Sequence, residues 1–392
     1  MLKRTKLVLA LAALLVLAGC GNLKGSGTGT TANTANSKGV QTTGQTGEDN
    51  YTGVIENGRY KTSAARGLTV TQTDNMLNVQ SIETGLTNLS KTEFPTDKYL
   101  LQEGQYLKKS TLLVQSSDNS TPSTGWLARK SKENPEGLNP EDNNKKEPNT
   151  RNPLYLQQIV EQDYVSQTNN KSLTLGGVSI ALGMNSVDYY QKETYGAEFK
   201  TEISDAQLLE QGKQMANTVL ARLRQRADLK NVPIIIGIYK QAPKDSLVGG
   251  TFVATSTNKG GSQKVAKWTT VNQKNQVLPT INDEKAVNSG DSDAFSNFKT
   301  QIQSFFPNLS GVVAQAHYDN NQLTGMNITV NTQFYGETEI TSFTQYIAQA
   351  AGRYLPRNVP ININIMSTQG MQAYVARSRG GKDFSTHVFG SY

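Results

Sequence analysis

The stretch Val232-Pro-Ile-Ile-Ile-Gly-Ile-Tyr239 best indicates how this chain folds. A short, unbroken run of β-branched residues is typical of a central strand that is buried on both faces. Pro233 stands at the start of the run, where a strand tolerates the missing N–H group. We therefore expect a sheet with this strand near its centre and with other elements packed against both of its sides.

Helical patterns surround this strand. Ser204 followed by Gln207 is a capping-box signature, and an apolar stripe continues from it to about residue 228. By the same spacing argument, further helices are expected over residues 76–89, 154–165, 291–306 and 338–354. Further strands are expected over residues 171–182, 251–256, 267–271, 311–318, 323–334 and 361–365.

This order of elements predicts an α+β fold with mixed or antiparallel sheets and packed helices, arranged in two lobes. We place the N-terminal lobe at residues 68–200 and the C-terminal lobe at residues 201–392. A polar stretch over residues 117–153, which contains Trp126, is expected to form a long, mobile loop.

The first 19 residues have the pattern of a secretory signal peptide. Lys3, Arg4 and Lys6 precede an apolar run that ends at Ala18. This run is shorter than the roughly 20 residues that a membrane-spanning helix needs, and it fits a signal-peptide core. The sequence Leu17-Ala18-Gly19-Cys20 resembles the lipobox of bacterial lipoproteins. We expect cleavage between Gly19 and Cys20 and a diacylglyceryl group on the thiol of Cys20.

Residues 20–67 are expected to form a disordered linker behind the lipidated cysteine. The start of this stretch is dominated by Gly, Ser, Thr and Asn and has few aliphatic residues. Such a composition buries too little apolar surface to fold. The linker would hold the folded body away from the membrane surface.

Composition excludes several classes of site. The chain has 392 residues with 39 Lys+Arg against 32 Asp+Glu, a mild excess that gives no argument for a nucleic-acid partner. The densest basic cluster outside the C-terminal tail consists of Arg222, Arg224, Arg226 and Lys230. It is interpreted as the solvated end of a helix, with contact to anionic lipid or a cell-wall polymer as the alternative. One cysteine and two histidines exclude an intramolecular disulfide, a cysteine-rich zinc module and a three-histidine zinc centre. Neither a hydrolase motif nor a nucleotide-binding motif is present, so we expect no enzyme activity, no catalytic residue, no metal and no cofactor.

One cluster of side chains has the chemistry of a ligand site. Gln102, Glu103 and Gln105 place amide and carboxylate groups close together, and Tyr99 and Tyr106 flank them. Such a group either lines a cleft for a sugar or peptide or holds a loop in place, and we favour the second interpretation.

Several sequence blocks resemble a known family. They are Phe94-Pro-Thr-Asp-Lys-Tyr-Leu-Leu-Gln-Glu-Gly-Gln-Tyr-Leu107, Asn231–Ser246, Phe305–Gly311, Gln333–Gly336 and Ser342–Ile347. In this order, over about residues 70–376, they resemble the CamS-type sex-pheromone precursor lipoproteins of Gram-positive bacteria. The resemblance implies a body without an established biochemical activity, held on the outer face of the cell membrane through diacylglyceryl-Cys20.

The resemblance also implies that processing peptidases release a hydrophobic heptapeptide from the leader. In this chain the peptide would consist of Ala13, Leu14, Leu15, Val16, Leu17, Ala18 and Gly19. The body would then bind an unknown ligand or cell-wall partner. The alternative is an extracytoplasmic solute-binding or cell-wall-binding lipoprotein whose leader serves for targeting alone. A third reading, an envelope hydrolase, is disfavoured by the missing motifs.

Overall fold

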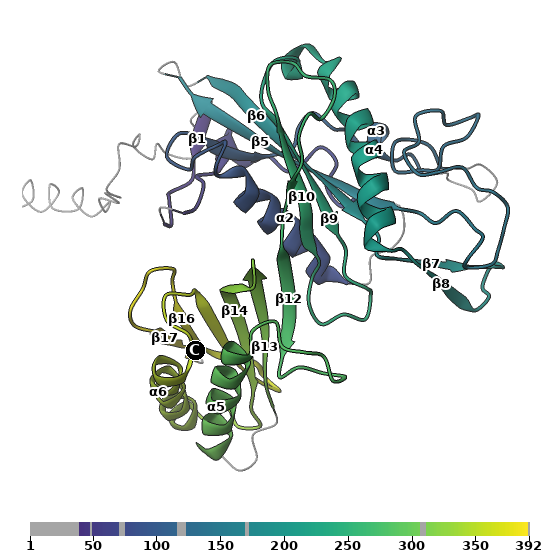
Figure 1. Ribbon diagram of the computed structural model, residues 1–392. Coiled ribbons are helices and arrows are strands. Elements are labelled where there is room, and N and C mark those ends of the chain that lie inside the picture. Colours follow the sequence, from purple (N-terminus) through teal and green to yellow (C-terminus); the bar gives the residue numbers. More distant parts are fainter. Residues whose placement is uncertain are drawn as a thin grey trace, which may run out of the picture.

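The computed structural model describes residues 39–47, 49–69, 75–115, 123–168, 172–305 and 311–390. Cys20, the expected signal peptide and the candidate heptapeptide lie outside the described residues. Two six-stranded sheets, each with its own helices, form the two main bodies of the molecule (Figure 1). The expected α+β class with mixed sheets and packed helices is confirmed. Within the described residues, no helix is both long enough and apolar enough to cross a membrane.

The first sheet has the strand order β11-β10-β9-β6-β5-β4. Its strands are β4 (Leu100–Glu103), β5 (Leu156–Gln167), β6 (Leu173–Met184), β9 (Ile234–Lys240), β10 (Thr251–Asn258) and β11 (Thr269–Thr270). β6 and β9 run parallel, and the other neighbours are antiparallel. The expected central strand is confirmed, because β9 is buried from Ile234 to Tyr239.

Two helices cover opposite faces of this sheet. Helix α4 (Asp205–Arg224) packs on the side of Ile236 and Ile238, whereas α2 (Met76–Ser90) packs on the side of Tyr239. The capping box of α4 is confirmed, since the Ser204 hydroxyl accepts from the Gln207 N–H at 3.3 Å. Strands β10 and β6 thus flank β9 within the sheet, and the two helices cover both faces of the sheet. This burial on all sides explains the unbroken apolar run of β9.

The expected solvated end of α4 is wrong for Arg224. Its side chain is buried, and its guanidinium donates to the carbonyls of Leu229 at 2.6 Å and Val232 at 2.7 Å. A guanidinium satisfied by carbonyls needs no carboxylate to be held inside the protein. Arg222 and Arg226 instead lie over the rings of Trp126 and Tyr106, at 5.1 and 5.5 Å.

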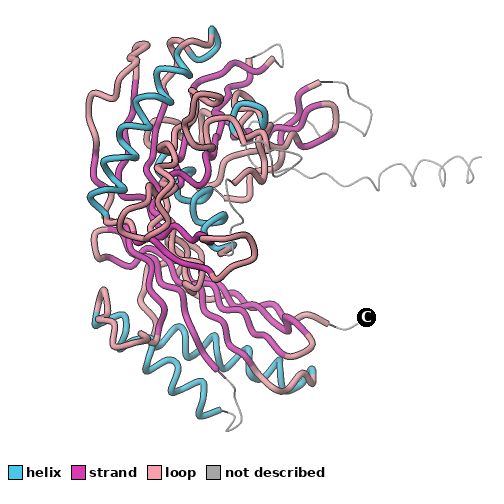
Figure 2. The backbone as a smooth tube through the Cα atoms, turned by 90° about the vertical axis from the view of Figure 1, so that its right-hand side faces the viewer, coloured by secondary structure: helices cyan, strands magenta, loops and turns pink. Residues whose placement is uncertain are grey.

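The second sheet has the order β12-β13-β14-β15-β16-β17. Its strands are β12 (Gln273–Leu278), β13 (Gly311–Asp319), β14 (Gln322–Asn331), β15 (Ile361–Ser367), β16 (Gly370–Arg377) and β17 (Ser385–Val388). The hairpin predicted between β13 and β14 is confirmed, with Asn320 and Asn321 at positive φ. Helices α5 (Ser289–Phe305) and α6 (Glu337–Tyr354) pack on one face, and within the described residues no helix of this body covers the other, as Figure 2 shows.

A helix was expected over residues 154–165, and this prediction is wrong. The segment forms most of β5, between β4 and β6. Both of its faces are covered, so its side chains are buried without the alternation that marks a half-exposed strand. Its buried polar residues gave the segment an apolar spacing of three and four, which favours a helix in the sequence.

The expected division at residues 200/201 falls inside the first sheet. β6 ends before this point and β9 begins after it, yet the two strands are hydrogen-bonded neighbours. The change of sheet lies instead between β11 and β12, near residue 271. A crossover that contains α4 joins the parallel strands, and such a unit cannot be divided without breaking the sheet.

Residues 39–60, expected within the disordered linker, form a small antiparallel sheet. It consists of β1 (Val40–Thr42), β2 (Val54–Glu56) and β3 (Arg59–Tyr60). The folded body supplies the apolar contacts and hydrogen bonds that this segment lacks by itself. Val54 is buried, and the Leu101 N–H donates to the Thr52 carbonyl at 3.0 Å. The linker prediction is therefore wrong over this part, since it counted only the apolar residues of the segment itself.

The remaining described elements are short. They are α3 (Lys109–Leu112), the 3₁₀ turn η1 (Ala227–Leu229) and a hairpin of β7 (Val187–Gln191) with β8 (Glu198–Glu202). Of the long loop expected over residues 117–153, residues 123–153 are described and contain no named helix or strand. This part lies against the core, because Trp126 and Leu127 are buried.

Candidate functional site

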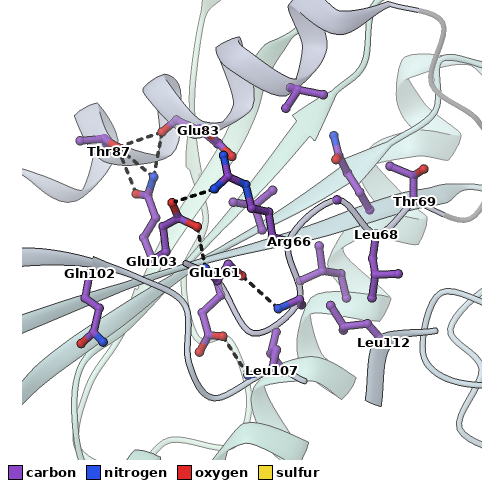
Figure 3. A pocket seen from close by; sticks show the side chains of 18 of the residues that line it. Arg66, Leu68, Thr69, Glu83, Thr87, Gln102, Glu103, Leu107, Leu112 and Glu161 are labelled. Atoms are coloured by element: carbon purple, nitrogen blue, oxygen red, sulfur yellow. Dashed lines mark hydrogen bonds and ion pairs between the residues drawn. The ribbon is translucent and has the colours of Figure 1, made fainter. Parts of the chain in front are cut away.

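A cavity of about 580 Å³ lies where β4 ends beside β5. Helix α2 and the segment Ser63–Thr69 form its other walls (Figure 3). Its lining combines apolar and charged side chains, among them Arg66, Leu68, Glu83, Glu103, Leu107 and Glu161. This volume is within the range of sites for small molecules.

Glu103 is the last residue of β4 and ties the neighbouring segment to the sheet. Its carboxylate accepts from the Tyr60 hydroxyl at 3.0 Å and from the Ser63 N–H at 2.6 Å. The Arg66 guanidinium lies 4.0 Å from the same carboxylate, but two-thirds of the Arg66 side chain is exposed. An ion pair this exposed adds little stability, so Arg66 remains available for an anionic group in the cavity.

The residues after Glu103 wrap around two buried carboxyl groups. The N–H groups of Tyr106 and Leu107 point at Glu161, at 3.2 and 2.8 Å, and the Gln105 N–H donates to Asp163 at 2.9 Å. Successive backbone N–H groups turned toward one point form an anion-binding concavity. Here the chain fills that concavity with its own carboxyl groups.

Gly104 is required for this close approach. A Cβ atom at position 104 would lie 2.4 Å from the Cβ atom of Glu161. Real Cβ atoms do not come so close, so any other residue would push the loop away from β5.

Burial raises the pKa of both Glu161 and Asp163, and the neighbouring Glu161 carboxylate raises the pKa of Asp163 further. Glu161 accepts from two backbone N–H groups, whereas Asp163 accepts from one, so the proton that the pair holds resides on Asp163. Burial also raises the pKa of Glu83 on the opposite wall.

The structure separates the residues expected to form one ligand site. Gln102 and Glu103 are both among the lining residues, but Figure 3 shows their side chains on opposite sides of β4. Gln105 holds the loop, donating from Nε2 to the carbonyls of Thr62 at 3.0 Å and Glu103 at 2.8 Å. Tyr106 lies beneath Arg226, outside the lining.

Tyr99 belongs to a different part of the first body. Its ring packs edge-on against Phe94 at 5.4 Å and fills the space left by Gly176. Tyr99 is not among the described residues that line the cavity. Ligand binding by any of the five residues stays a prediction.

Sequence reasoning missed Glu161 and Asp163 because it placed them on a helix. Two carboxylates two positions apart point to the same side of a strand. Their position between the apolar pairs Ile159-Val160 and Tyr164-Val165 was the available signal, because an unpaired charge is not left inside a core. A search for the backbone donors that pair with them would have led to residues 104–107.

The arrangement is suited to binding rather than to a recognisable reaction. Glu161 accepts from backbone donors, and Asp163 accepts from one through Oδ2, while its buried Oδ1 has no partner in the described part of the chain. Glu103 accepts from Tyr60 and Ser63. Among the described residues, no three His, Cys, Asp or Glu side chains come together as a metal site. The apolar walls and Arg66 fit a small ligand that has an apolar part and an anionic group.

Fold and cavity together define an α+β protein of two mixed sheets with a small-molecule-sized cavity at the end of an edge strand. A family model described as the CamS sex pheromone cAM373 precursor matches residues 60–383, most of the chain. The chain therefore belongs to the CamS sex pheromone precursor family.

Two solved structures are similar to the chain. A sex pheromone precursor from Lactobacillus salivarius subsp. salivarius UCC118 is 50% identical, with a TM-score of 0.83, over 90% of this chain and 100% of that one. The C-terminal domain of the sex pheromone staph-cAM373 precursor from Staphylococcus aureus is 30% identical, with a TM-score of 0.67, over 81% of this chain and 98% of that one. No curated protein matches the chain.

Proposed function

We propose that this chain is a lipid-anchored extracytoplasmic lipoprotein whose leader yields the hydrophobic heptapeptide Ala13–Gly19. One observation supports this most directly: the only cysteine, Cys20, ends a leader with the pattern of a lipoprotein signal peptide. The family to which the chain belongs is described as a pheromone precursor, which agrees with a leader that is itself a product.

The residues around the expected cleavage point suit both processing steps. Ala18 and Gly19 are small, so the peptide bond before Cys20 can enter a signal peptidase. The thiol of Cys20 is the nucleophile that a diacylglyceryl group would alkylate. The released peptide would have no charged side chain, so it would partition into membranes and act at low concentration.

The body is proposed to be a non-enzymatic domain that binds a ligand. The cavity beside Glu103 has apolar walls, and its Glu103 and Glu161 carboxyl groups already accept from donors of the chain itself. The alternative, a solute-binding or cell-wall-binding lipoprotein without a pheromone role, differs in the fate of the leader. The same experiment therefore tests both.

The experiment is mass spectrometry of culture supernatant for the free peptide Ala13–Gly19. We expect the peptide from cells that express the unchanged chain and a large loss, at least tenfold, from cells that express Cys20→Ala, because lipidation precedes cleavage. Ser26→Ala is the control in the linker and leaves the leader unchanged.

Two outcomes would contradict the proposal. If the unchanged chain yields no peptide, the pheromone part fails and the targeting alternative holds. The membrane fraction gives an independent readout of the anchor. If the membrane-bound unchanged chain has an N-terminal Cys20 without the mass of a diacylglyceryl group, lipid anchoring through Cys20 is wrong.

A further inference from the structure

A second hollow lies between the two bodies. One part, of about 270 Å³, is bounded by α2, by the segment Val248–Phe252 and by the second sheet. The other part, of about 380 Å³, lies on the helix-free face of that sheet. Gln315 and Asn327 line both parts, so we treat them as one hollow, called the junction groove from here on.

Polar contacts hold the two walls of the junction groove together. The Gln315 side-chain amide donates to the Leu247 carbonyl at 2.6 Å, and that of Asn275 donates to the Gly249 carbonyl at 2.8 Å. Figures 1 and 2 show the helix-free face of the second sheet turned toward the first body, with α5 and α6 on its far side. The groove is thus built by both bodies.

The described lining of the junction groove contains no Asp, Glu, Lys or Arg. Charged residues make up 18% of the chain, so a lining of this size would ordinarily include several. His317 is its one imidazole, and burial lowers its pKa, so it is uncharged at neutral pH. An ionic ligand would lose its hydration here without gaining a partner of opposite charge.

Side-chain amides take the place of charges. Six of them lie on the second sheet and face the groove: Gln273, Asn275, Gln315, Asn327, Asn362 and Asn364. Each amide has donor and acceptor atoms, so it can pair with hydroxyl groups and with other amides in either sense.

The sheet itself does not require the amides of Asn327, Asn362 and Asn364. β14 and β15 are the two central strands of the sheet, and Asn is among the residues that strands disfavour. Ile361, Ile363 and Ile365 supply the core side of β15, and the intervening positions Asn362 and Asn364 face the groove. At a solvent-facing strand position without a function, threonine or a charged residue would be more usual than asparagine.

Part of this amide set is already oriented. The Asn362 amide donates to Asn327 Oδ1 at 2.9 Å, and the Tyr374 hydroxyl donates to Asn362 Oδ1 at 2.6 Å. These contacts fix the side chains and lower the entropy that a ligand would have to remove. Tyr374 also brings an aromatic ring to the groove, a surface on which an apolar sugar face can pack.

We propose that the junction groove binds an uncharged polysaccharide chain through its hydroxyl and acetamido groups. The choice of ligand follows from the match between a neutral, amide-rich lining and a neutral, hydroxyl-rich and amide-rich polymer. The site is separate from the cavity beside Glu103, and the proposal does not depend on how the leader is processed.

The test is isothermal titration of the full chain, purified in detergent, with an N-acetylglucosamine hexamer as the uncharged probe. We expect saturable binding. Asn327→Ala and Asn364→Ala should each weaken it about three- to tenfold, the effect of losing one or two hydrogen bonds. The double variant should weaken it by more than either single variant.

The matched control is Gln322→Ala. Gln322 is an exposed amide on β14 that does not line the groove, so its loss should change the affinity less than twofold. Thermal unfolding of each variant checks the fold independently of binding, because all three side chains lie outside the core of the second body.

Four results would overturn the proposal. One is no saturable binding of the hexamer at millimolar concentration, and another is unchanged affinity in the double variant. The third is tighter binding of a glycerol-phosphate polymer, which would show that an anion is preferred. If the chain instead forms a dimer that the double variant abolishes, a second copy occupies this face and the polysaccharide is wrong.

Discussion

Among single residues, Asp163 gives the clearest pH prediction. Burial and the adjacent Glu161 raise its pKa, so the folded chain keeps a proton that the unfolded chain releases above about pH 4. The unfolded state then binds fewer protons, and the free energy of unfolding falls as pH rises, by about 1.4 kcal/mol per pH unit for one proton. This loss continues until the pH passes the raised pKa of the folded state.

Asp163→Asn removes this proton linkage and keeps a neutral group of the same shape. We expect the variant to lose less stability than the unchanged chain between pH 5 and pH 8, by about 1–3 kcal/mol. Urea unfolding at the two pH values measures the difference. Asp383→Asn, at an exposed position, is the control. An Asp163→Asn chain that loses as much stability as the unchanged chain would show that Asp163 is ionised when folded.

At the level of elements, the loop over residues 123–155 depends on one buried amide. The Asn139 side chain donates to the carbonyls of Leu127 and Leu156, at 2.7 and 2.9 Å. It also accepts from the N–H groups of Tyr155 and Leu156, at 2.8 and 2.9 Å. The Asn139 side chain therefore supplies this loop with the backbone hydrogen bonds that a neighbouring strand would otherwise make.

Asn139→Ala should lower the free energy of unfolding by about 3 kcal/mol or more, because four buried backbone groups lose their partner. Asn139→Asp should be nearly as harmful, since a carboxylate cannot donate to the two carbonyls. Urea unfolding measures both. Asn297→Ala, on the exposed surface of α5, should stay within about 0.5 kcal/mol. A mild Asn139→Asp variant would mean that the donated bonds contribute little.

The same elements show how far sequence reasoning extends. α2, α4 and α6 were predicted because their apolar stripes are local, and α4 has its own cap. β5 was not predicted, because a strand with both faces covered loses the alternation of apolar and polar residues. In addition, its carboxyl groups pair with residues 105–107, which are remote in the sequence. In the candidate site, Glu103 was therefore identified and Glu161 was missed. The junction groove was also missed, since α2 and β14 meet only in the folded chain.

At the scale of the whole molecule, the two bodies have separate cores. Every residue of the second core follows Val277, and the first core uses none of them. The contacts at the junction are mainly polar, such as that of the Gln315 side-chain amide with the Leu247 carbonyl at 2.6 Å and that of the Phe252 N–H with Gln273 at 3.2 Å. Polar contacts between bodies add far less stability than a shared apolar core.

We therefore expect residues 272–392 to fold alone, as a unit of about 120 residues, a usual size for a domain. Circular dichroism should show one cooperative thermal transition at nearly the temperature of the second body in the full chain. The isolated unit keeps Asn327 and Asn364 but lacks the wall formed by α2, so its affinity for the N-acetylglucosamine hexamer should fall below that of the full chain. A non-cooperative transition would show instead that the polar junction is needed to hold the second sheet together.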